Sequence, residues 1–109
     1  DFWASWCKPC RDQSPELVKL YNTYQNKGFT IISVSLDSNN ERWLRAIKDD
    51  NLNWKHVSNL ERWKDPIAAE YNVRSIPEVF LIDDNGTVLA RSHDLKSIKS
   101  ILQNATADL

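Results

Sequence analysis

Both cysteines of the chain lie near its start, in the order Cys7-Lys8-Pro9-Cys10. A short, largely apolar run that ends at Trp6 precedes them, and Pro9 stands where the first turn of a helix tolerates a missing N–H. The pattern predicts a strand, a short loop and a helix that begins at the cysteines. The free N–H groups and the dipole of that helix, together with the Lys8 cation, favour a thiolate at Cys7 and should lower its pKa below the free value of about 8.5.

The spacing of the two cysteines suits a redox pair. Residues three apart on a helix share one face, within the roughly 4.4–6.8 Å Cα separation that a disulfide requires. We therefore expect Cys7 to be the nucleophile and Cys10 the resolving thiol. A zinc site is the first alternative, but the other candidate ligands, His56 and His93, lack the close spacing of a finger. A purely structural disulfide is the second, although so short a loop would constrain the unfolded chain little.

Two segments carry a family resemblance. The run Asp1-Phe2-Trp3-Ala4-x-Trp6-Cys7-x-Pro9-Cys10, with Pro15 beyond it, resembles the active-site segment of the thioredoxin superfamily. Ile76-Pro77, followed by Val79 to Asp83 and Asn85-Gly86, resembles that superfamily's cis-proline loop and hairpin. The longer segment between them is similar to that of TlpA/ResA-like thiol-disulfide oxidoreductases.

The resemblance runs from Asp1 to about Leu102 and implies an α/β thioredoxin-like fold. In such a fold a mixed central sheet is flanked by helices. An extra helix and a short strand would be inserted before the cis-proline loop.

The resemblance also implies roles for single residues. Pro77 would be cis and lie against the disulfide, leaving the Ile76 backbone free to pair with an extended substrate strand; an ordinary trans proline is the alternative. Asp1 matches a buried acid beneath the resolving cysteine, where desolvation would raise its pKa and let it accept the Cys10 proton. A frayed terminal residue is the alternative for Asp1. Substrate contacts are expected from Trp6, on the rim of the site, and from Lys8, Pro9 and Ile76.

Gln13 departs from the family pattern. Many TlpA/ResA-like proteins carry a glutamate three residues after the second cysteine, and an amide cannot titrate. Proton transfer is then left to Asp1 or water. His56 and His93 are expected to be surface-loop residues without a catalytic role. Large rings are more often buried than used as binding platforms, so core positions are expected for Trp43, Trp54 and Trp63.

Apolar periodicity and cap signals predict four helices and, besides the opening strand, four more strands. The helices are expected at Pro9–Asn26 with Gly28 as the C-cap, from Asp37–Asn40 to about Asp50, from Asp65-Pro66 to Tyr71, and at Asp94–Gln103. The strands are expected at Phe29–Leu36, Leu52–Val57, Glu78–Asp83 and Thr87–Arg91, the last two as an antiparallel hairpin. Ala105–Leu109 is expected to be frayed.

The length, composition and net charge of the chain limit its domain number and its possible ligands. A chain of 109 residues with 41% hydrophobic content makes one domain, residues 1–109, with one core. A net charge of −1 offers no field for nucleic acid, and no apolar run approaches the roughly 20 residues of a membrane span. With Gly28 and Gly86 as the only glycines, no phosphate loop and no nucleotide cofactor are expected. The chain opens inside what should be a central strand, so we expect it to be trimmed at its N-terminus, with any export signal or anchor upstream.

These observations predict an enzyme that exchanges a Cys-x-x-Cys dithiol or disulfide with protein substrates. By resemblance we expect a monomeric reductase, without metal or cofactor, in the bacterial periplasm or envelope and served by a partner thiol-disulfide reductase. A peroxiredoxin-like peroxidase is an alternative, but the Pro-x-x-x-Thr-x-x-Cys frame it needs is missing before Cys7. A copper-delivery module similar to Sco-type proteins is another, but those space their cysteines by three residues rather than two. Tight Cu(I) binding at the thiolates would separate it from exchange chemistry.

Overall fold

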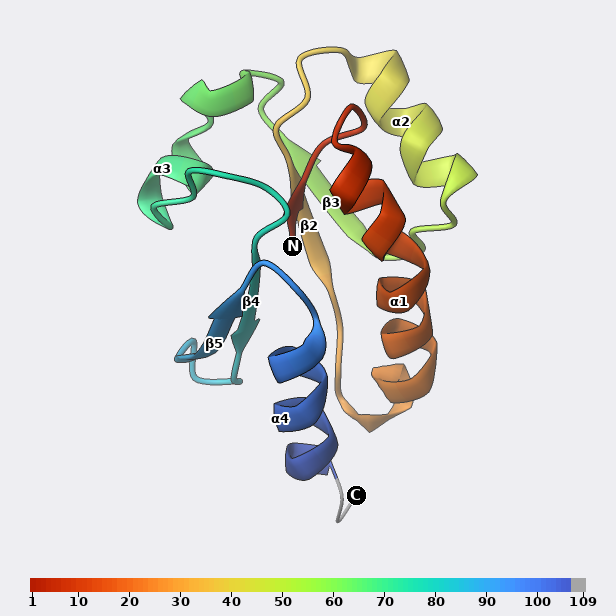
Figure 1. The fold of residues 1–109 in the computed structure, drawn as a ribbon, viewed down its shortest axis with the longest axis vertical. Helices are drawn as coiled ribbons and strands as arrows, with labels where there is room; N and C mark the ends of the chain where they lie inside the picture. Colours follow the sequence, from red (N-terminus) through yellow and green to blue (C-terminus); the bar gives the residue numbers. More distant parts are fainter. Residues whose placement is uncertain (107–109) are drawn as a thin grey trace.

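The computed structural model describes residues 1–106 and contains two small sheets with helices packed around them (Figure 1). Three parallel strands make the first sheet in the order β1 (Phe2–Trp3), β2 (Ile32–Ser35), β3 (Lys55–Ser58). The second sheet is an antiparallel hairpin of β4 (Val79–Ile82) and β5 (Val88–Ser92). An antiparallel bridge between Phe2 and Glu78 joins the two sheets. The mixed sheet predicted as one unit is thus two sheets that meet at the strand leading to the cysteines.

The helices begin and end largely where the cap signals place them. They are α1 (Lys8–Tyr24), the 3₁₀ helix η1 (Gln25–Lys27), α2 (Asn40–Asp49), the 3₁₀ helix η2 (Arg62–Lys64), α3 (Pro66–Glu70) and α4 (Lys96–Thr106). Asn39 caps α2 by accepting the backbone N–H of Arg42 at 2.9 Å, and Asp65 caps α3 by accepting that of Ala68 at 2.9 Å. Gly28 ends η1 with a φ of 82°, a left-handed conformation that glycine adopts without strain.

Several predicted boundaries are wrong. Strand β2 starts at Ile32 rather than Phe29, because its pairing with β3 begins there, and β3 starts at Lys55 rather than Leu52. Helix α4 starts later than predicted, since the Asp94 carboxylate accepts the backbone N–H of Lys96 at 2.9 Å. It also continues through Ala105, predicted as frayed, to the buried Thr106, whose hydroxyl donates to the Leu102 carbonyl at 2.7 Å. The rest of the predicted frayed segment, residues 107–109, lies outside the described residues.

Buried apolar side chains form two clusters rather than the single core predicted. The first surrounds β1 and contains both cysteines; its members are Phe2, Trp3, Ala4, Cys7, Cys10, Val34, Leu36, Ala46, Leu52, Ala68 and Val73. The second joins α1, β4 and α4 through Leu17, Leu20, Tyr24, Ile31, Val79, Leu95, Ile98 and Leu102. Trp54 packs against both. None of the helices within residues 1–106 is long and apolar enough to cross a membrane.

Candidate active site

The two cysteines form a disulfide at the start of α1, with their Cα atoms 5.3 Å apart. Cys7 is the N-cap residue, and its Sγ accepts the backbone N–H of Cys10 at 3.2 Å. Pro9 stands in the first turn, where no intrahelical N–H is needed. The predicted strand, loop and helix start are therefore confirmed. One of the free N–H groups of the helix points at the sulfur proposed as the nucleophile.

The side chains beside the disulfide differ sharply in exposure. Cys7 is 6% and Cys10 3% exposed, whereas Trp6 is 53% exposed and next to Cys7 in the chain. Lys8 is also exposed, but its ammonium pairs with the Asp12 carboxylate at 2.9 Å. The cation expected to favour a Cys7 thiolate is therefore shared with a neighbouring anion, and the helix start remains as the main favourable influence.

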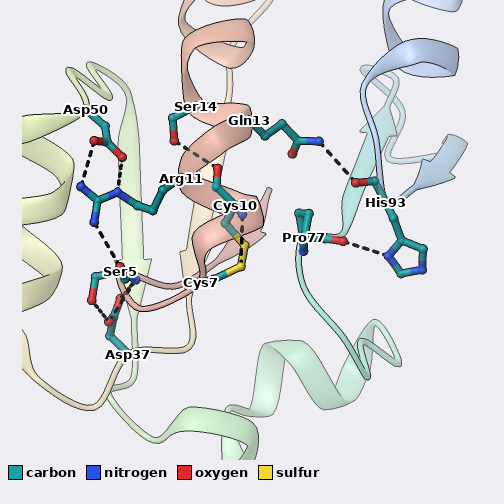
Figure 2. The surroundings of a disulfide bond; sticks show 10 residues. All are labelled: Ser5, Cys7, Cys10, Arg11, Gln13, Ser14, Asp37, Asp50, Pro77 and His93. Carbon is teal, nitrogen blue, oxygen red and sulfur yellow. Dashed lines mark hydrogen bonds and ion pairs between the residues drawn. A yellow bond between two sulfur atoms is a disulfide. The ribbon is translucent and has the colours of Figure 1, made fainter.

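A buried carboxylate holds the loop that leads to Cys7. Asp37 is 1% exposed. It accepts the Ser5 backbone N–H at 3.2 and 3.1 Å and the Ser5 hydroxyl at 2.5 Å (Figure 2). The Ser35 hydroxyl at the end of β2 donates to the same carboxylate at 2.5 Å. Asp37 was predicted only as part of the cap before α2, so its role at the active-site loop was missed.

Arg11 holds the same loop from the other side. Its guanidinium donates to both carboxylate oxygens of Asp50, with Nη2 2.9 Å from Oδ1, and Nη1 donates to the Ser5 carbonyl at 3.1 Å. The hydrogen bond to Asp50 raises the pKa of Arg11, so the guanidinium stays positively charged. Helix α1 is thereby tied to the end of α2, and Ser5 is fixed through its N–H, its hydroxyl and its carbonyl.

The Ile76–Pro77 peptide bond is cis, as the resemblance implies. Pro77 lies among the residues that surround the disulfide (Figure 2). His93, which follows β5, approaches the Pro77 carbonyl with Nδ1 at 2.8 Å, and its own carbonyl accepts the side-chain amide of Gln13 at 3.3 Å. His93 is exposed, as predicted, yet it connects the Pro77 segment to α1.

Asp1 is tied into the first sheet rather than frayed. Its carbonyl accepts the Val34 N–H at 2.7 Å, and its carboxylate accepts the Ser33 hydroxyl at 2.6 Å. That hydroxyl in turn accepts the indole N–H of Trp54 at 2.8 Å. The carboxylate is thus engaged with β2. Its predicted role as acceptor of the Cys10 proton stays a prediction.

His56 is not the surface-loop residue predicted from the sequence. It lies in β3, half-buried, with its ring stacked on Trp54 at 5.9 Å and Nε2 2.9 Å from the Leu52 carbonyl. Burial lowers its pKa, although the hydrogen bond to Leu52 opposes this shift. Trp43 and Trp54 pack against the buried clusters, whereas Trp63 in η2 is exposed.

Glu78, directly after Pro77, is a buried carboxylate that was not among the predicted site residues. Its neighbours in the chain are apolar or proline, so nothing local marks it. The register of the hairpin could have revealed its partners. If the pairing of β4 with β5 is counted outward from the Asn85-Gly86 turn, basic residues in β5 and just after it fall opposite Glu78. The irregularity between Leu81 and Ile82 shifts that count by a residue.

Metal-ligating side chains are not clustered in the described part of the chain. Within residues 1–106, no group of three or more His, Cys, Asp or Glu side chains is arranged to hold a metal ion. A shallow depression of about 420 Å³ lies between α1 and α4, with Gln13, Glu16 and Lys99 in its lining. The disulfide is therefore the chemically distinctive group of this region.

Replacing Gln13 by glutamate should raise the pKa of Cys7. The Gln13 amide donates to the His93 carbonyl, and its Oε1 is buried with no hydrogen-bond partner among the described residues. An ionised carboxylate there would put a negative charge one turn beyond Cys10 and disfavour the thiolate. Thiolate absorbance followed against pH measures the effect. Asn22→Glu, the same charge on an exposed position farther along α1, should leave the pKa unchanged, and an unchanged Gln13→Glu pKa would mean that residue 13 does not act on the site.

Known proteins resemble this chain in sequence and in structure. Residues 1–88 match a family described as Thioredoxin-like. Thioredoxin-like protein YneN of Bacillus subtilis is 34% identical over 91 residues, which cover 81% of this chain and 51% of that protein. Thiol-disulfide oxidoreductase ResA of Geobacillus kaustophilus is 33% identical over 88 residues, covering 81% and 49%. The chain spans about half the length of the curated relatives it matches. A solved thiol-disulfide oxidoreductase from Bacteroides fragilis has a TM-score of 0.88 at 33% identity, over 95% of this chain and 77% of that one.

Proposed function

The chain belongs to the thioredoxin-like family, and from this membership we propose that it exchanges disulfides with protein substrates in the reducing direction. The observation that carries the proposal is the Cys7–Cys10 disulfide at the N-terminus of α1, with the Cys10 N–H directed at the Cys7 sulfur. That N–H stabilises negative charge on Cys7 once the disulfide is reduced.

Exchange proceeds in two steps from the reduced protein. The Cys7 thiolate attacks one sulfur of the substrate disulfide; a Cys7–substrate S–S bond forms, the substrate S–S bond breaks, and one substrate thiolate leaves. The Cys10 thiolate then attacks Cys7 Sγ, which re-forms the Cys7–Cys10 disulfide and releases the second substrate thiolate. Two electrons pass to the substrate, and Cys10 gives its proton to water or to Asp1.

The residues around the disulfide would bind the substrate during this exchange. An extended substrate segment pairs with the backbone of Ile76 beside Pro77, and Trp6 forms an apolar rim next to Cys7. Lys8 and Pro9, both exposed between the cysteines, face the incoming chain. Within residues 1–106 the Ile76 backbone takes part in no backbone hydrogen bond, which supports this use of it.

The resemblance to TlpA/ResA-like proteins extends the proposal to the partner, the location and the fold of this chain. We propose a partner thiol-disulfide reductase that returns electrons to Cys7 and Cys10, a monomeric state and an extracytoplasmic site of action. We also propose that α2 and β3, which lie between β2 and the Pro77 segment, are the addition that separates this chain from a plain thioredoxin.

The reduction potential of the pair should lie nearer that of thioredoxin, about −270 mV, than that of a strong oxidant, about −120 mV. The expectation rests on the Lys8-Pro9 dipeptide between the cysteines and on the family. Equilibration with glutathione or dithiothreitol buffers, followed by counting free thiols, measures it. A value above roughly −180 mV, the level of a disulfide isomerase, would overturn the reducing direction while leaving disulfide exchange itself intact.

A direct test of exchange is the dithiothreitol-driven reduction of insulin, followed as precipitation of the freed chains. The wild-type protein should accelerate it, and the double variant Cys7→Ser/Cys10→Ser should not. Equal rates with both proteins would remove the proposed function.

A further inference from the structure

Glu78 is a buried carboxylate held by two basic side chains. Its side chain is 4% exposed, and a buried charge is costly unless it is paired. The Arg91 Nε donates to Oε1, and His93 Nδ1 lies 2.7 Å from Oε2. The same Nδ1 lies 2.8 Å from the Pro77 carbonyl, to which its N–H donates. Glu78 Oε2 has no hydrogen-bond partner among the described residues, so Arg91 is the side chain that donates to Glu78.

Arg91 contacts both ends of the segment that contains Pro77, residues 71–78, which we call the Pro77 loop. Besides Glu78 at one end, its Nη1 donates to the Tyr71 carbonyl at 3.1 Å and its Nη2 to the Asn72 carbonyl at 2.9 Å. The guanidinium also lies over the Phe80 ring, 4.8 Å from its centre. A single planar cation thus spans the beginning and the end of the loop.

The Pro77 loop is fastened in turn to the elements that carry the cysteines. The Phe2 N–H in β1 donates to the Glu78 carbonyl at 2.9 Å, and the Glu78 N–H donates to the Phe2 carbonyl at 3.4 Å. On the other side, Gln13 of α1 donates to the His93 carbonyl (Figure 2). The Glu78 backbone thus joins the Pro77 loop to β1, while the Glu78 side chain joins it to Arg91.

We propose that Glu78 and Arg91 are positioning residues that hold the Pro77 loop in the shape that binds an extended peptide. The inference rests on the proposed function, in which the Ile76 backbone pairs with the substrate. A loop already held in its binding shape loses little conformational freedom when the peptide arrives, so it binds more tightly. We call the pair of Glu78 and Arg91 the clamp. It acts on peptide binding rather than on the sulfur chemistry, since neither side chain contacts a cysteine sulfur in the described contacts.

The test compares two substrates with the same leaving group. One is a linear decapeptide whose cysteine is joined to thionitrobenzoate; the other is the symmetrical thionitrobenzoate disulfide, which has no peptide to pair with Ile76. Pre-reduced protein is mixed with each over a range of concentrations, and the released thionitrobenzoate is read by absorbance in a single turnover. This gives a maximal rate and a half-saturating concentration for the peptide, and a rate constant for the small disulfide.

Glu78→Gln keeps the size of the side chain but removes the charge that Arg91 holds. We expect its half-saturating peptide concentration to rise by about tenfold, with the maximal rate changed less than about twofold. Its rate with the small disulfide should equal that of the wild type. Glu70→Gln, the same change at an exposed position at the end of α3, should match the wild type with both substrates.

Arg91→Lys supplies a second variant, because lysine keeps the charge but cannot make the three separate contacts of the guanidinium. It should shift the half-saturating concentration in the same direction as Glu78→Gln, and it serves alone if Glu78→Gln does not fold. An equal loss with both substrates, or no loss with either, would refute the clamp. A wild-type protein inactive on both disulfides would instead remove the proposed function, and the clamp with it.

Discussion

Replacing Cys10 by serine should turn the protein into a trap for its substrates. The backbone N–H that donates to Cys7 Sγ belongs to residue 10 and survives the change, so the nucleophile stays favoured. Attack still forms the Cys7–substrate disulfide, but no thiol remains to break it. We expect turnover to fall by about a thousandfold or more, with covalent adducts that are visible as reducible high-mass species.

Cys7→Ser should fail differently. The remaining thiol, Cys10, lies one turn inside α1, away from the helix-start N–H that donates to Cys7 Sγ, so few adducts and no turnover are expected. Mass spectrometry of the Cys10→Ser adducts would also name the substrates. If Cys7→Ser captured more substrate than Cys10→Ser, the assignment of the nucleophile from the helix start would be wrong.

Asp37→Ala should lower the stability of the protein strongly. The change leaves the Ser5 N–H and the hydroxyls of Ser5 and Ser35 without their acceptor in a buried site. Each buried donor left without a partner costs about 1–3 kcal/mol, so the loss of this acceptor should remove a large part of the roughly 5–15 kcal/mol that stabilises a typical domain. Urea unfolding followed by tryptophan fluorescence measures the free energy of unfolding.

Two further variants control this prediction. Asp37→Asn keeps one oxygen acceptor and should lose only about 1–2 kcal/mol, so it remains measurable if the alanine variant does not fold. Asp49→Ala removes an exposed carboxylate in the last turn of α2 and should change stability by less than about 0.5 kcal/mol. Equal free energies for Asp37→Asn and the wild type would show that the carboxylate charge is not needed at the Ser5 loop.

The sequence was informative for several features that depend on near neighbours. The helix start at Cys7, the cap at Asp65, the left-handed Gly28 and the hairpin after Pro77 each follow from residues within a few positions of one another, and each is present. Local chemistry of this kind acts on the backbone whatever the rest of the chain does.

The features that escaped prediction depend on residues far apart in the chain. Asp37 was assigned to a helix cap because it precedes α2, yet its partner Ser5 lies 32 residues away. Glu78 gave no local signal, because the side chains that neutralise it come from across the hairpin. The surface-loop prediction for His56 is wrong because its burial comes from packing against Trp54 and Trp3, the second of which lies far away in the chain.

The bridge between Phe2 and Glu78 makes one amide proton a natural reporter. The Phe2 N–H donates to the Glu78 carbonyl where the two sheets meet, and Phe2 is buried. Such a proton exchanges with deuterium from the solvent only when the structure around it opens. Its exchange rate therefore measures how often the sheet that leads to Cys7 separates from the one that begins after Pro77, in the oxidised or the reduced protein and without any chemical label.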